Sequence, residues 1–154
     1  MSKAGGNWRK AFRTRDFWNC QLLDAHNLIF RRELTRFRGV EVKTLGDGFL
    51  ATFDGPGRAI HCSLALIATL RSLGIEIRAG LHTGEVEVGE NDVRGIAVHV
   101  AARVVALARP SECLVTRTVK DLVAGAEIRF TERGRHDLKG LAEAIDLFAA
   151  ASTP

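Results

Sequence analysis

Residues 42–53, VKTLGDGFLATF, place two apolar runs of β-favouring residues on either side of a Gly-Asp-Gly tripeptide. Glycines tolerate positive φ, so this pattern predicts a tight hairpin between strands at residues 40–45 and 49–53. Asp47 then stands at the tip, and an exposed carboxylate is a good ligand for a hard cation such as Mg²⁺. Gly-Asp-Gly turns also occur without any ligand, so these residues alone leave both interpretations open.

The rest of the chain alternates helical and strand patterns. Apolar residues at helical spacing predict helices at residues 18–37, 57–73 and 95–108, and a helical turn near Val119. Strand patterns fall at residues 75–82, 85–88, 113–115, 127–132 and 144–148. This order predicts an α/β (α+β) fold in which helices pack on a mostly antiparallel sheet.

The length of 154 residues suits a single domain, which we place at residues 18–150, with a C-terminal tail at 151–154. Residues 1–17 are expected to form a basic tail, because five Lys and Arg residues precede the first acidic residue. This tail matches no nucleic-acid motif, so we do not expect nucleic-acid binding. The sequence contains neither a membrane span nor a secretory signal, and its three cysteines are far apart, so we expect a cytoplasmic protein.

A second cluster of interest runs from Asp92 to Arg103, DVRGIAVHVAAR. His99 and Arg103 are four residues apart, so they share one face of the predicted helix. Their neighbours are apolar, and a guanidinium in such a setting favours a carboxylate or phosphate partner. A surface arginine beside a core histidine explains the same residues equally well.

Three stretches in this order, VKTLGDGFLATF, RAGLHTGEVEVG and DVRGIAVHVAARV, resemble the catalytic domain of class III nucleotidyl cyclases. The resemblance covers residues 18–148, including LLDAH near the start and HDLKG near the end. It implies the ferredoxin-like fold of that family. It also implies an adenylyl cyclase activity, which converts ATP into cyclic AMP and pyrophosphate.

The resemblance also implies roles for individual residues. Lys43 matches the lysine that reads the adenine ring, and Asp92 matches the carboxylate that accepts a hydrogen bond from the adenine amino group. Asp47 matches one of two aspartates that hold a pair of Mg²⁺ or Mn²⁺ ions. This Lys/Asp combination is typical of ATP rather than GTP as the substrate.

The remaining implied residues serve the ribose and the phosphates. Arg103 matches the arginine that stabilises charge on the transferring phosphate, and His99 stands where many members carry an asparagine that orients the ribose. Lys139 matches a late basic residue near the triphosphate. Members of the family pair head to tail, so a homodimer would hold two shared sites.

One expected segment is absent. The family carries its first metal aspartate on a strand of the FTDIVGST type before LLDAH, and residues 1–17 contain no such stretch. Asp16 is interpreted as a helix cap rather than as the missing ligand. We therefore expect a sheet that lacks its first strand and a domain truncated or degenerate at its N-terminal end.

Two functional hypotheses follow from the matched residues together with the absent first strand. The first is a degenerate adenylyl cyclase whose activity is weak or absent, because one aspartate holds two ions poorly. The second is a non-catalytic relative that binds nucleotide or pairs with an intact cyclase. Loss of a single N-terminal block favours truncation or decay, since the other matched residues remain suited to ATP.

Overall fold

The computed structural model describes residues 12–22, 27–45, 48–90 and 92–154, and for residues 12–22, 44 and 45 it describes the main chain alone. Within these ranges the helices are α1 (Asn27–Arg36), α2 (Pro56–Ser72), α3 (Ile96–Leu107) and α4 (Arg117–Leu122). The strands are β1 (Phe12–Leu22), β2 (Val40–Leu45), β3 (Gly48–Phe53), β4 (Ile77–Val88), β5 (Val93–Arg94), β6 (Glu112–Thr116), β7 (Ile128–His136) and β8 (Ile145–Ser152). Of these helices, none combines the length and the apolar composition that crossing a membrane requires.

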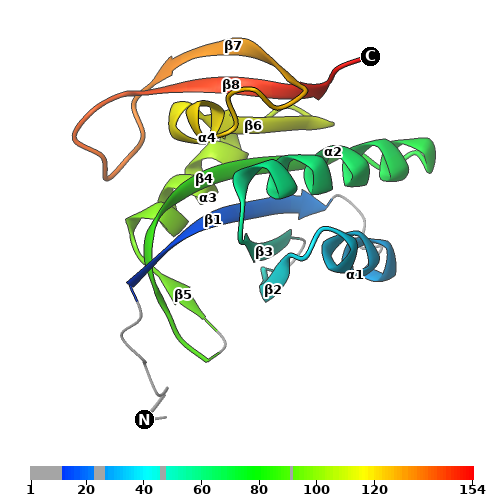
Figure 1. The fold of residues 1–154 in the computed structure, drawn as a ribbon, viewed down its shortest axis with the longest axis horizontal. Coiled ribbons are helices and arrows are strands. Elements are labelled where there is room, and N and C mark those ends of the chain that lie inside the picture. The colour runs from blue at the N-terminus through cyan, green and yellow to red at the C-terminus, as the bar shows by residue number, and fades with distance from the viewer. Residues whose placement is uncertain (1–11, 23–26, 46–47, 91) are drawn as a thin grey trace.

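The strands form one twisted sheet in the order β2-β3-β1-β4-β6-β8-β7, and β5 pairs with the far end of β4 (Figure 1). The pairings are antiparallel except for that between β4 and β6, which is parallel. The predicted α+β class, with helices packed on a mostly antiparallel sheet, is therefore confirmed.

The expected gap at the first strand is wrong. Residues 12–22 form β1, which pairs along one edge with β3 and along the other with β4. The predicted helix at residues 18–37 is correspondingly wrong at its start, because α1 begins at Asn27. Pairing on both edges satisfies the backbone donors and acceptors of the strand, and this tertiary gain outweighs a weak local pattern. Asp16 accordingly lies within β1 rather than at a helix start.

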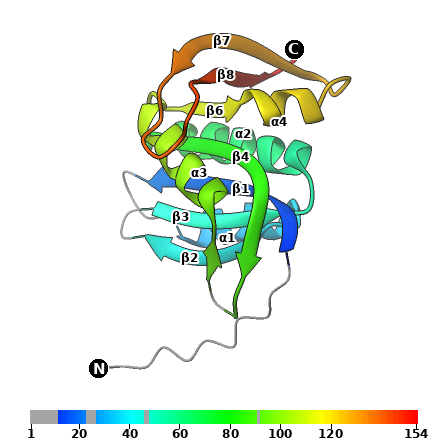
Figure 2. The ribbon, with the colours of Figure 1, turned by 90° about the vertical axis from the view of Figure 1, so that its left-hand side faces the viewer.

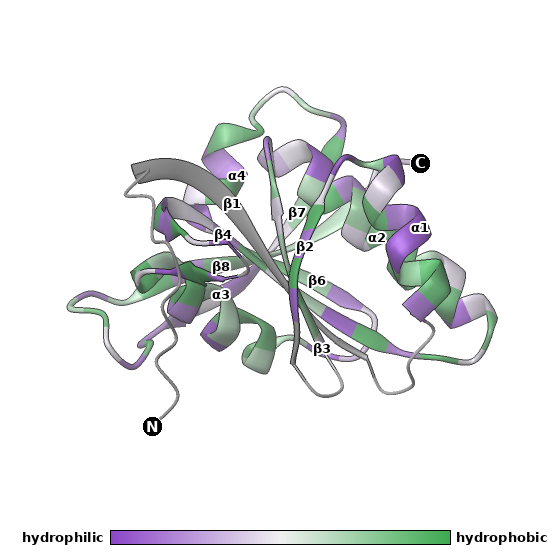
Figure 3. Cartoon of the chain, turned by 90° about the horizontal axis from the view of Figure 1, so that it is seen from below, coloured by the Kyte–Doolittle hydropathy of each residue, from purple (hydrophilic) through white to green (hydrophobic). Residues whose placement is uncertain are grey.

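The sheet has a different helix layer on each face (Figure 2). Helices α1 and α2 cover one face, and α3 covers the other. Strand residues alternate between these layers: Leu81 and Val115 belong to the larger core under α1, α2 and α4, whereas Leu114 packs with Val104 of α3. Figure 3 shows hydrophilic and hydrophobic residues alternating around α1, as expected of a helix with one buried face.

Helix α3 lies unusually close to β4 because the strand carries glycines where the helix crosses it. A Cβ atom on Gly80 would lie 2.4 Å from the backbone nitrogen of Val105, and one on Gly84 would lie 2.9 Å from the Cβ of Ala97. These contacts leave room for no side chain. The position of α3, and of every side chain that it carries, therefore depends on two glycines of β4.

The other predicted elements agree with the structure, apart from their ends. The hairpin strands and the helices at residues 57–73 and 95–108 are confirmed as β2, β3, α2 and α3. The predicted strands 75–82 and 85–88 are one continuous strand, β4, so Thr83 and Gly84 do not interrupt it. Because β1 begins at Phe12 and β8 ends at Ser152, both predicted tails contribute residues to the sheet.

Candidate functional site

Lys43 and Asp92, which are 49 residues apart in the sequence, form an ion pair in the folded chain. The Nζ atom of Lys43 lies 3.1 Å from Oδ1 of Asp92. Both side chains are partly open to solvent, with 42% of Lys43 and 34% of Asp92 exposed. The pair is therefore accessible to a ligand.

Two local features bring these residues together. The ladder between β2 and β3 changes register between Glu41 and Lys43, and such irregularities re-aim side chains. Val42 packs against a small cluster that contains Val93 of β5, so β2 is tied to the hairpin that precedes α3. Val42 and Val93, the sequence neighbours of Lys43 and Asp92, thus pack in one apolar cluster that holds the ion pair together.

Asp92 is held as a carboxylate by its surroundings. Partial burial alone would raise the Asp92 pKa, but several favourable contacts outweigh it. These are the hydrogen bond from Lys43, a 2.9 Å hydrogen bond from the backbone N–H of Val93 to Oδ1, and the charges of Lys43 and Arg94. The pKa of Asp92 is therefore lowered, and the group is a ready acceptor at neutral pH.

Three other predicted residues gather around one cavity of about 250 Å³. His99 and Arg103 project from α3, and Lys139 comes from the loop between β7 and β8. Val100 and Leu138 are buried beside them in the same core cluster, which fixes the loop against the helix. Two cations and an imidazole around a small hollow make a suitable setting for an anion.

A larger cavity of about 550 Å³ lies where β4, β5 and α3 meet, and its wall includes His82, Glu85, Glu87, Arg94 and Ile96. Nδ1 of His82 shares a 2.9 Å hydrogen bond with Oγ1 of the buried Thr116, and burial lowers the His82 pKa to about 4. None of these five residues was predicted from the sequence to have a role in the site. A signal for His82 was available, because it lies at an alternate strand position between Gly80 and Gly84.

The predicted residues form two groups along one band of the surface. One group is Lys43 with Asp92, and the other is His99 with Arg103 and Lys139. Arg94 approaches Asp92 and also lines the larger cavity, while Ile96 lines both cavities. The band thus runs from the Lys43–Asp92 pair along β5 and the start of α3 to Arg103. Neither Lys43 nor Asp92 is part of the wall of these two cavities.

Asp47, the predicted metal ligand, lies outside the described residues. The adjacent Gly48 is aligned with Gln21 of β1, whereas Asp16 is aligned with Phe53 at the other end of β3. Five residues of strand separate Asp16 from Gln21, which corresponds to about 17 Å. The described residues also contain no group of three or more His, Cys, Asp or Glu that could hold a metal ion. Asp16 is therefore not placed to act with the hairpin.

The comparison with protein families agrees with this fold. The family model described as the adenylate and guanylate cyclase catalytic domain matches residues 13–149. The chain therefore belongs to the adenylate and guanylate cyclase catalytic domain family, as the three stretches predicted.

Individual relatives support the same assignment. A protein of Rhizobium meliloti (strain 1021), named as a candidate adenylate cyclase, number 3, is 31% identical over 120 residues. That alignment covers 72% of this chain but only 20% of the relative, so this chain spans a small part of the length of such proteins.

Solved structures establish the fold. The adenylate/guanylate cyclase/hydrolase of Silicibacter pomeroyi matches with a TM-score of 0.81 at 23% identity, covering 94% of this chain and 98% of that one. The catalytic core of a rhodopsin-guanylyl cyclase with converted specificity, in complex with ATPαS, also matches with a TM-score of 0.81, at 17% identity. It covers 92% of this chain and 97% of that one.

Proposed function

We propose that this chain is an adenylyl cyclase domain that binds ATP and has weak or no turnover by itself. The observation that carries the proposal is the 3.1 Å ion pair between Lys43 and Asp92. Adenine presents an amino group that donates a hydrogen bond and ring nitrogens that accept one. An ammonium beside a carboxylate is complementary to that edge, since Lys43 donates and Asp92 accepts.

In this proposal, the phosphates of ATP bind to the residues around the smaller cavity. The guanidinium of Arg103 and the ammonium of Lys139 suit a triphosphate, and we propose that His99, in the wall of the same cavity, contacts the ribose. In the reaction, the ribose 3′-hydroxyl attacks the α-phosphorus, cyclic AMP forms and pyrophosphate leaves. Arg103 would stabilise the negative charge that develops on the phosphate.

In this proposal, a complete site is shared between two copies of the chain. The base-reading pair and the phosphate group lie at different points of the surface band, and the larger cavity lies between them. We therefore propose a head-to-tail homodimer in which Lys43 and Asp92 of one copy act with Arg103 of the other. A heterodimer with an intact cyclase would use the same surface.

Divalent ions serve the cyclases of this family in general. The sequence offers one matched metal aspartate, Asp47, which lies outside the described residues, and a single aspartate holds two ions poorly. We therefore assign no step of the reaction to a metal here. Low turnover is the expected consequence, whether the ion in use is Mg²⁺ or Mn²⁺.

A binding and turnover experiment tests the proposal. ATP should displace a fluorescent ATP analogue from the purified chain, and Lys43→Ala should weaken that displacement by about tenfold or more, because a charge-assisted hydrogen bond is lost. Lys120→Ala, on α4, is the matched control. Cyclic AMP formed with MnATP is measured on the same samples. Equal ATP affinity in the wild type and the Lys43→Ala variant would refute the role of Lys43.

Mixing two inactive variants tests the shared site. In a head-to-tail dimer, Lys43→Ala paired with Arg103→Ala leaves one of the two sites intact. Random pairing should then restore about a quarter of the wild-type signal for ATP binding or turnover. A mixture that is no better than its separate components argues against a site shared between copies. Restored binding without cyclic AMP would favour the non-catalytic alternative.

A further inference from the structure

A groove that the proposed function does not use lies between α4 and the β7–β8 hairpin, at the opposite end of the sheet from β2 (Figure 1). It consists of two cavities of about 410 and 220 Å³, which adjoin because Arg117, Arg135 and Asp146 are in the walls of both. The described residues proposed to bind nucleotide are in neither wall. A ligand of this α4–β8 groove would therefore bind apart from the nucleotide.

One extra residue in β7 directs a cation into the groove. Glu132 is aligned with Phe148 and Arg135 with Asp146, so three steps along β7 match two steps along β8. Aligned residues of an antiparallel pair point to the same face, so Arg135 lies with Asp146 on the face that carries Phe148 and the larger core. Gly134, within this irregularity, has a φ of 86°, which glycine adopts without strain.

Two arginines share the carboxylate of Asp146 and keep donors for a ligand. Arg117 Nε lies 3.1 Å from Oδ2, and Arg135 Nη1 lies 3.6 Å from Oδ1, which is longer than a hydrogen bond. In the part of the chain that the structure describes, neither guanidinium makes any other hydrogen bond. Their side chains are 57% and 62% exposed. Because a guanidinium carries its donors in a fork that fits a carboxylate, a second anion can bind here.

The groove also presents apolar surface beside these cations. Leu122, at the end of α4, is 59% exposed and lines the larger cavity together with Ala144 and Ile145. The ring of the buried Phe148 lines the smaller cavity, and Lys120 Nζ lies 4.8 Å from its centre. A ligand that fills the groove therefore meets aliphatic surface as well as positive charge.

Two further carboxylates limit what the groove can accept. Asp121 lines the larger cavity and Glu132 lines the smaller one, so negative charge is present on both parts of the groove. A run of acidic residues would be repelled by both, whereas a single carboxylate held at the two arginines would not. The charges thus favour one acidic group with uncharged neighbours.

We propose that the α4–β8 groove docks a peptide segment of a partner protein in which one aspartate or glutamate stands between aliphatic residues. The carboxylate of that segment accepts hydrogen bonds from Arg117 and Arg135, and an aliphatic neighbour packs on Leu122. This docking surface is independent of nucleotide binding, so it stands or falls separately from the proposed function.

Peptide binding to the full chain tests this inference. Three short fluorescent peptides serve as probes: one with a central glutamate between leucines, one with glutamine in its place, and one in which aspartates replace the leucines. Fluorescence anisotropy measures their binding to the wild type, Arg117→Gln and Arg135→Gln. Arg129→Gln is the matched control, because Arg129 is an exposed arginine of the same strand that points to the other face. Thermal melts confirm that each variant is folded.

We expect the wild type and Arg129→Gln to bind the single-glutamate peptide about tenfold more tightly than either other peptide, because a charge-assisted hydrogen bond is gained. Arg117→Gln and Arg135→Gln should lose this preference. Equal binding of the glutamate and glutamine peptides, or tighter binding of the aspartate-rich peptide, overturns the inference. So does a wild type that does not bind the single-glutamate peptide, or an equal loss in Arg129→Gln.

Discussion

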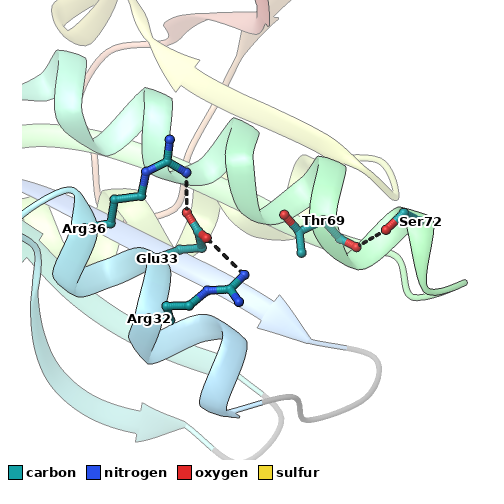
Figure 4. Close-up of polar contacts among 5 residues, drawn as sticks. All are labelled: Arg32, Glu33, Arg36, Thr69 and Ser72. Carbon is teal, nitrogen blue, oxygen red and sulfur yellow. Dashed lines mark hydrogen bonds and ion pairs between the residues drawn. The ribbon is translucent and has the colours of Figure 1, made fainter.

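Glu33 is a buried carboxylate on α1, with 4% of the residue exposed, and two exposed arginines meet its charge (Figure 4). Arg32 Nη2 lies 3.3 Å from one carboxylate oxygen, and Arg36 Nη1 lies 3.2 Å from the other. A buried charge is tolerated when it is paired and hydrogen-bonded. The helix thus turns a polar residue toward the core while keeping its cations in water.

Removing both cations should therefore destabilise the domain. We expect Arg32→Gln with Arg36→Gln to lower the free energy of unfolding by about 1–3 kcal/mol, because Glu33 is left buried without its partners. Adding Glu33→Gln to the double variant should recover part of this loss. Urea unfolding measures all three proteins. A double variant as stable as the wild type would show that Glu33 is satisfied without its arginines.

Cys62 and Cys113 are free and buried in the larger core. Burial raises the pKa of Cys62 to about 12, and the nearby charge of Glu33 adds to the shift. Burial likewise raises the pKa of Cys113 to about 12. The reactive form of a cysteine is the thiolate, so both are expected to be inert in the folded state.

Alkylation should reveal this protection. At pH 8, iodoacetamide should modify Cys62 and Cys113 about a thousandfold more slowly in the native protein than in urea, because a three-unit rise in pKa depletes the thiolate to that degree. Peptide mapping by mass spectrometry distinguishes these two from Cys20. Rapid native labelling of either residue would contradict the burial described above.

At the scale of elements, the contact between α3 and β4 positions most of the candidate site. His99 and Arg103 are on the helix, and Asp92 and Arg94 are on the hairpin that leads into it. The helix lies where it does because Gly80 and Gly84 have no side chains. The two glycines at this crossing therefore determine where the charged residues of the site lie.

A methyl group at that crossing should disturb the helix. We expect Gly80→Ala to destabilise the domain by about 1–3 kcal/mol, since the new Cβ would overlap the main chain of Val105. Gly57→Ala is the control, because nothing lies within 4 Å of a Cβ at that position. The melting temperatures of both variants test this. An unchanged melting temperature for Gly80→Ala would mean that α3 can move away at little cost.

The same scale explains which elements the sequence predicted well. Helices α2 and α3 and the hairpin of β2 and β3 carry strong periodic patterns and clear turn residues. Strand β1, FRTRDFWNCQL, has no aliphatic run, and its place in the sheet depends on β3 and β4, which lie 27 or more residues later. A local window cannot contain that information.

Over the whole molecule, charge and burial together determine how stability depends on pH. His82 is on β4, lines the larger cavity beside the start of α3, and shares a hydrogen bond with Thr116 of β6. Its pKa falls from 6.5 to about 4 because its partial burial disfavours the charged imidazolium. Below pH 6.5 the unfolded chain binds a proton at this residue that the folded protein resists, so acid favours unfolding.

The stability due to neutral His82 should be complete above pH 6.5 and lost as the pH falls toward 4. The depression corresponds to about 3 kcal/mol over that window. The stability due to the lowered pKa of Asp92 is complete above its ordinary value of 3.8 and is lost only as the pH falls below that value, outside this window. Unfolding free energies of the wild type and His82→Gln between pH 7 and 4 test this, with exposed His61→Gln as the control. Equal slopes in all three proteins would rule out His82 as the cause.

The sequence by itself determined the family, the strands of the β2–β3 hairpin, the two main helices and the candidate residues. These features are encoded in short stretches, where turn residues and apolar spacing act locally. The proximity of His99 and Arg103 is also encoded in a short stretch, because the two residues are four positions apart on one helix.

Only the tertiary structure decided where distant segments meet. It placed β1 inside the sheet, and it put Arg94 beside Asp92 and His82 beneath the start of α3. It also gathered Lys139 with Arg103 around one hollow. Such contacts depend on strand order, register and the close approach of a helix to a strand. These are properties of paired surfaces, and no single segment of the chain contains them.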